Sequence, residues 1–235
     1  MWTELLQIFR ANDPMRNMAG DFLKMLDLTR EMAEIVRPHV LNNSLSFEQR
    51  RKVYKLDISV NKLERTVRKR VIAHLSLRHQ GDVLHALLMM TLVKDVERVG
   101  DYIKNIAEVS ELGGAALPEG EIRTELDDLV RIAHMIFDEV APIISGQDNA
   151  RAIELIEEGR NAGKRCDRLL VELAKSEMTP AQTTATVLLT RFYKRIGAHL
   201  VNILSSVVMP LHKVDFFDEK ELDTTNTKEE VEVSS

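Results

Sequence analysis

The sequence predicts an all-α protein, built as two tandem antiparallel three-helix bundles related by internal duplication. Aromatic residues make up only 5% of the 235 residues, and 10 Gly and 6 Pro are too few for the many turns of an all-β protein. Apolar residues recur at the helical period of 3.6 residues in six stretches. Two segments 97 positions apart also share a motif, which points to a repeated plan.

Three helices are expected in the first half, residues 13–112. Asp13-Pro14 starts the first helix, because Asp caps a helix and Pro favours its first turn. That helix is expected to end at Asn42-Asn43. Ser46 begins the second with a capping-box pattern. The third starts near Asp82 and stops at a Gly pair.

Residues 113–118, Gly-Gly-Ala-Ala-Leu-Pro, are expected to form a linker. Helical periodicity then restarts, and residues 119–211 are predicted to form a second three-helix bundle. Ser145-Gly146 separates its first two helices, and Thr179-Pro180 starts the last one. Short connections make successive helices antiparallel neighbours.

The two ends of the chain differ from the body. Residues 1–12 form a short amphipathic segment, expected to dock on the body, on a second copy, or on a partner or membrane surface. Residues 212–235 are predicted to be a disordered acidic tail. From Lys213 onward the chain has eight acidic and three basic residues, which leaves 29 of each in the body. This balance does not favour a nucleic-acid partner.

A single cysteine, Cys166, fits a reducing compartment and a core position.

The repeated motif aligns residues 97–106 with residues 194–203 without a gap. Identical pairs include Arg98 with Arg195 and Asn105 with Asn202. Both segments carry a glycine in mid-helix, Gly100 and Gly197. Because such a glycine costs about 1 kcal/mol relative to Ala, we expect another backbone to approach closely at both places.

Acidic residues border the apolar stripes of the second and third helices. One face of the second helix carries Asp57, Asn61 and Glu64, and the third carries Glu97 and Asp101 with Asp95 nearby. Facing helices would bring these carboxylates together, and such crowding favours a bound cation such as iron, manganese or zinc. The alternative is a set of ordinary salt bridges with neighbouring basic residues, namely Lys94, Arg98 and Lys104.

The segment Asp95-Val-Glu-Arg-Val-Gly-Asp101, followed by Asn105-Ile-Ala-Glu108, resembles the signature of the PhoU family. Leu56-Asp-Ile-Ser-Val-Asn-Lys-Leu-Glu64 is similar to that family's companion motif. The resemblance implies two three-helix bundles and a cytoplasmic regulator, without enzyme activity, that restrains phosphate uptake and signalling. It also implies contacts with a transporter or sensor kinase at the inner membrane face, and iron or zinc as the metal. The implied metal ligands are Glu97, Asp101, Asp57 and Glu64, with Asn61 and Asp95.

The second half departs from this signature. Lys194 and Ala198 replace its two acids, and Gly159 and Gly163 align with the companion positions. An alternative alignment would use acids one turn earlier, namely Glu154, Glu157 and Glu158. We therefore expect one metal site, in the first half, with the Lys194 ammonium able to stand where a second metal would sit. A divergent paralogue of the family fits this pattern.

Two other functions stay open at this level. One is a carboxylate-bridged metalloenzyme in a helical bundle; such enzymes combine Glu with Glu-x-x-His, a pair that is missing near the acidic motifs. The other is a metal-free adaptor bundle.

No apolar run reaches the length of about 20 residues that spans a membrane. Assembly with a second copy of the chain is left open.

Overall fold

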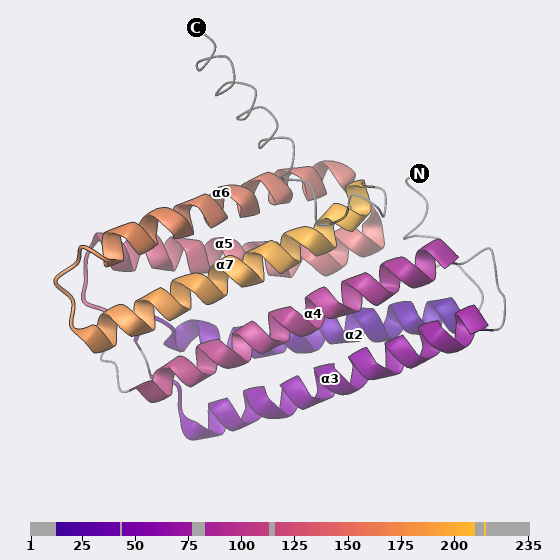
Figure 1. Cartoon of the computed structure of the whole chain (residues 1–235), viewed down its shortest axis with the longest axis horizontal. Helices are drawn as coiled ribbons and strands as arrows, with labels where there is room; N and C mark the ends of the chain where they lie inside the picture. Colours follow the sequence, from indigo (N-terminus) through magenta and orange to yellow (C-terminus); the bar gives the residue numbers. More distant parts are fainter. Residues whose placement is uncertain (1–12, 43, 77–82, 113–115, 210–213, 215–235) are drawn as a thin grey trace, which may run out of the picture.

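A computed structural model describes residues 13–42, 44–76, 83–112, 116–209 and 214 (Figure 1). Over these residues the chain is helical and contains no strand, which confirms the all-α prediction. The long helices are α2 (Asp13–Val36), α3 (Phe47–Ser76), α4 (Val83–Val109), α5 (Glu121–Gly146), α6 (Asn149–Leu173) and α7 (Pro180–Val208). The segment 1–12 and, apart from Val214, the predicted tail from residue 212 lie outside the described residues.

Local side chains cap the starts of three helices, α3, α6 and α7. The backbone N–H of Ser46 donates to the Gln49 side chain at 2.8 Å, and the Gln49 N–H donates back to Ser46 Oγ at 3.2 Å. This is the predicted capping box. Thr179 and Gln182 form a second one at α7. The expected end of the first helix was wrong: α2 ends at Val36, not at Asn42-Asn43. Pro38 explains this, because it has no N–H to donate and restricts the residue before it.

Helices α2, α3 and α4 pack on one another, and so do α5, α6 and α7 (Figure 1). The two groups meet mainly where α4 lies along α7, with a smaller contact between α2 and α5. Buried side chains from all six helices join in one hydrophobic core. The two halves are therefore held together by apolar packing as well as by the chain connection.

The core stripes agree with the helical period read from the sequence. Five large side chains of α2 are at most 1% exposed, namely Met15, Met18, Phe22, Met25 and Met32. Each such burial stabilises the fold by about 1.5–3 kcal/mol relative to exposure. Cys166 is 2% exposed, as expected for a small core residue. Burial raises the pKa of its thiol to about 11, which makes it a poor nucleophile.

The described part of the linker, residues 116–118, is held against the body. Leu117 is 4% exposed, and its N–H donates to the carbonyl of Leu41 at 3.0 Å. Arg123 donates to the Leu117 carbonyl at 2.7 Å. These contacts hold the segment before α5 against the segment that joins α2 to α3.

Candidate functional site: the acidic seam between α3 and α4

The facing helices α3 and α4 run in opposite directions, and polar contacts define their register. Tyr54 Oη donates to Glu108 at 2.6 Å, and Lys104 Nζ donates to Asp57 at 3.1 Å. Because the two helices are antiparallel, a residue further along α3 faces a residue earlier in α4. Glu64 therefore lies at the level of Glu97. We call the resulting set of Asp57, Asn61, Glu64, Glu97 and Asp101 the acidic seam.

Lys104 joins the two helices at one end of the seam. Its Nζ lies 3.1 Å from Asp57 Oδ2 and 2.8 Å from Asp101 Oδ1. The Asn61 amide also donates to Asp57 Oδ2, at 3.3 Å. Burial works to lower the pKa of Lys104, but the hydrogen bonds to Asp101 and Asp57 outweigh it and the pKa is raised. A charged ammonium therefore stands between two carboxylates from different helices.

The other two acids of the seam have cations of their own. Lys94 donates to Glu97 at 2.6 Å, and Arg68 donates to Glu64 at 2.9 Å. The Glu64 and Glu97 side chains are only 10% and 13% exposed, so these pairs are partly shielded from water. The sequence alternative of salt bridges with Lys94 and Lys104 is thus realised.

The seam supplies suitable donors for a metal ion, but not in a converged arrangement. Carboxylate and amide oxygens are the ligands that hard and borderline cations take. Within the described ranges, no three His, Cys, Asp or Glu side chains are grouped so that they could hold a metal. A cation between Asp57 and Asp101 would have to displace the Lys104 ammonium.

Asp95 lies away from the seam, at the contact between α4 and α7. Its Oδ1 is 2.7 Å from His199 Nδ1 and 3.3 Å from the Asn202 amide nitrogen. The ring of Tyr102 stacks on His199 with centroids 5.8 Å apart. Asp95 therefore joins the two halves of the chain. No local pattern predicted this role, because its partners lie more than one hundred positions away in the sequence.

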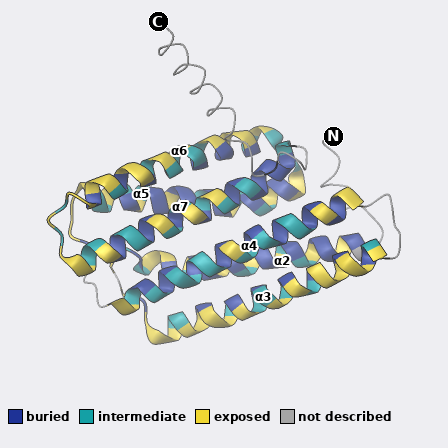
Figure 2. Ribbon diagram, viewed as in Figure 1, coloured by how far each residue is buried: buried dark blue, intermediate teal, exposed yellow. Residues whose placement is uncertain are grey.

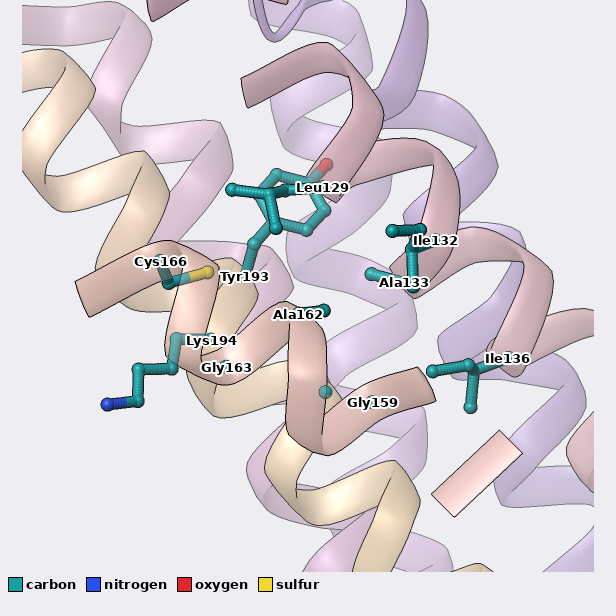
Figure 3. A pocket seen from close by; sticks show the side chains of 11 residues that line it. Leu129, Ile132, Ala133, Ile136, Gly159, Ala162, Gly163, Cys166, Tyr193 and Lys194 are labelled. Atoms are coloured by element: carbon teal, nitrogen blue, oxygen red, sulfur yellow. The ribbon is translucent and has the colours of Figure 1, made fainter. Parts of the chain in front are cut away.

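The corresponding place in the second half is a small pocket lined mainly by apolar side chains and glycines, not by acids (Figure 3). A Cβ added at Gly159 would lie 2.5 Å from Val201 Cγ2, so α6 and α7 approach closely there. Lys194 points to the neighbouring helix, where its Nζ lies 2.5 Å and 2.6 Å from the two carboxylate oxygens of Asp167. A side chain at position 159 would therefore fit only if Val201 or one of the two helices shifted.

The repeated mid-helix glycines behave differently from expectation. A Cβ at Gly100 would contact the Thr29 side chain at 3.3 Å, not a backbone atom, and at Gly197 it would meet nothing within 4 Å. The prediction of close backbone approach at both positions was therefore wrong. The tightest contact is at Gly159 on α6, outside the repeated motif, and there too the neighbouring atom belongs to a side chain, that of Val201.

Acids one turn earlier on α6 line a hollow together with Arg165; they are Glu154, Glu157 and Glu158. Arg151 donates to Glu154 at 2.8 Å. Arg165 reaches across to α5, where it donates to Glu125 and Asp128 at 2.6–2.8 Å. Arg165 thus holds α6 on α5, whereas the pair of Arg151 with Glu154 stays within α6.

No helix among the described residues combines the length and apolar character that crossing a membrane requires.

A comparison with curated protein sequences found no match. Residues 22–110 match the family model described as the PhoU domain. This range contains α3, α4 and the whole acidic seam.

Two solved structures resemble the whole described fold. PhoU from Pseudomonas aeruginosa aligns with a TM-score of 0.73 at 18% identity, over 85% of this chain and 97% of that one. The phosphate transport system regulatory protein PhoU from Streptococcus pneumoniae aligns with a TM-score of 0.71 at 15% identity, over 82% of this chain and 92% of that one. The chain therefore carries a PhoU domain over residues 22–110, within an overall fold that is shared with PhoU proteins.

Proposed function

We propose that this protein regulates phosphate transport and phosphate signalling by contact with other proteins, a phosphate transporter or its sensor kinase. The observation that carries the proposal is the PhoU domain over residues 22–110, which contains the acidic seam. The Streptococcus pneumoniae protein of similar fold is described as a phosphate transport system regulator. Both observations support a regulatory role for this chain.

The test of this function is a deletion of the gene in its own host. Uptake of labelled phosphate and expression of a phosphate-starvation reporter should both rise at high phosphate, because a restraint has been removed. The wild-type chain should restore both. Unchanged uptake and reporter levels in the deletion strain would reject the regulatory role.

We further propose that iron or zinc binds at the acidic seam. Support comes from oxygen donors on two facing helices, Asp57, Asn61 and Glu64 on α3 with Glu97 and Asp101 on α4. Bound metal would supply a positive charge that ties α3 to α4. Asp95 could join this set only by leaving His199.

Elemental analysis of protein purified without chelator tests the metal. The double variant Glu97→Ala with Asp101→Ala should lose stoichiometric iron or zinc. Lys194→Ala, at the aligned position of the second half, should keep it. Unchanged metal content in the double variant would place the metal elsewhere.

A metal-free adaptor bundle is the second candidate, and the pairing within the seam favours it. Lys104, Lys94 and Arg68 already neutralise the carboxylates. Such an adaptor would keep its regulatory contacts in the presence of a chelator, whereas a metal-dependent regulator would lose them. Pull-down of the transporter or kinase with and without chelator separates the two.

A further inference from the structure

One face of α3 carries a regular row of cations and isoleucines. Seven residues follow one another at alternating steps of four and three, which places them on a single side of a helix. They are Arg51, Lys55, Ile58, Lys62, Arg65, Lys69 and Ile72, and we call them the basic stripe. All seven are exposed, and α3 forms the lower edge of the molecule in Figure 2.

The cations of the basic stripe differ from their neighbours on α3 in having no internal partner. Lys52, Arg68 and Arg70 form ion pairs with Glu31, Glu64 and Asp21. Among the described residues, none of the five cations of the stripe forms an ion pair. Glu48 is the one exposed acid of α3. Positive charge is therefore concentrated on one edge of a body whose total charge is balanced.

Apolar side chains stand singly among these cations. Ile58 is 51% exposed and Ile72 is 59% exposed, and Phe47 extends the row at the start of α3 with 67% exposed. From Arg51 to Ile72 the stripe is about 32 Å long at the helical rise per residue. This is a long, narrow strip of mixed character, not a compact apolar patch.

We propose that the basic stripe binds the surface of an anionic phospholipid bilayer. The cations would contact headgroup phosphates, while Ile58, Ile72 and Phe47 enter the interfacial layer. A protein partner is less well matched, because protein interfaces are built around a contiguous apolar centre depleted in Lys. The stripe has isolated apolar side chains and three lysines.

Bilayer contact along α3 would orient the whole molecule. Figure 1 places α3 and α6 at opposite edges, so the second bundle would face away from the lipid. The inference rests on the proposed regulation and extends it, because binding to the bilayer would hold the protein at the membrane surface, beside a membrane transporter. Lipid binding is measured without any transporter, so its failure is distinguishable from failure of the regulatory role.

Co-flotation of the full chain with vesicles tests the proposal. Vesicles of phosphatidylcholine with about 30% phosphatidylglycerol should capture the protein at low salt, and pure phosphatidylcholine should not. The variant Lys62→Gln with Arg65→Gln should bind about 25-fold more weakly, at about fivefold per cation removed. Its matched control is Lys175→Gln with Arg191→Gln, which removes one Lys and one Arg from exposed positions of the second half.

A second pair of variants tests the apolar part. Ile58→Ser with Ile72→Ser should weaken capture, whereas Ile153→Ser with Val171→Ser, on α6 at 47% and 56% exposed, should not. Because all four side chains are exposed, the fold should survive each change.

Three results would overturn the proposal. One is equal capture by neutral and anionic vesicles, and another is equal loss in the stripe and control variants. The third is binding of poly-glutamate or DNA to the stripe with no capture by anionic vesicles, which would assign it to an acidic protein or a nucleic acid.

Discussion

The ammonium of Lys104 lies 3.1 Å from Asp57 Oδ2 on the neighbouring helix, and it is shared with Asp101 on its own helix at 2.8 Å. The Asp57 side chain is 9% exposed and that of Lys104 is 21% exposed. One internal cation thus occupies the space between carboxylates that a metal ion would need. A substitution of Lys104 is therefore expected to change both the stability of the first bundle and the metal affinity proposed for the seam.

Lys104→Met should destabilise the metal-free protein by about 1–3 kcal/mol, because Asp57 is left buried beside a second carboxylate. The measurement is urea unfolding in the presence of chelator. Lys94→Met is the matched control. Its partner Glu97 lies on the same helix and Lys94 is 42% exposed, so the loss should stay below about 1 kcal/mol. Equal losses would mean that Lys104 makes no special link between α3 and α4.

The same Lys104→Met variant should bind zinc more tightly than the wild type, since no ammonium has to leave the seam. Titration calorimetry measures this affinity. Metal bound to the folded state adds stability by mass action, about 2.7 kcal/mol at a hundredfold excess over Kd. Hydrogen exchange should then slow within residues 13–112 and not within 119–211. Equal protection in both halves would contradict a site at the seam.

Two glycines of α6, four residues apart, should respond in opposite ways to alanine. Gly159→Ala places a Cβ 2.5 Å from Val201 Cγ2, and overpacking of this kind costs about 1–3 kcal/mol. Gly163→Ala meets nothing within 4 Å and should gain up to about 1 kcal/mol from helix propensity. Thermal unfolding compares the two. Val201→Ala should rescue Gly159→Ala; failure of the rescue would show that the two helices do not meet at this point.

Sequence reasoning reached the local features of this fold because their causes are local. The capping boxes at Ser46 and Thr179 and the buried position of Cys166 follow from spacing within one helix. What it missed depends on partners far along the chain. Lys104 is three residues from Asp101, yet its bond to Asp57 requires the register of two helices. Pro38, which ends α2, was a local signal that was overlooked.

His134 provides a pH test of the contact between the two bundles. It is 3% exposed, and its ring lies 6.3 Å from that of Tyr193, centroid to centroid. Burial, assisted by the charge of Arg37, lowers the pKa of His134 from 6.5 to about 4. The Glu34 carboxylate lies 3.7 Å from His134 Nδ1, but the Glu34 side chain is 55% exposed. It does not offset the effect of burial on the pKa of His134.

Because the folded state holds His134 neutral, the unfolded state takes up a proton first as the pH falls. This contribution to stability is therefore complete above about pH 6.5 and is lost progressively down to about pH 4, to a maximum of about 3 kcal/mol. Urea unfolding of the wild type and of His134→Gln over this range measures it. The free-energy difference between the two proteins should shrink on acidification. Parallel curves would show that His134 takes up a proton as readily in the folded as in the unfolded protein, so that water reaches it between the helices.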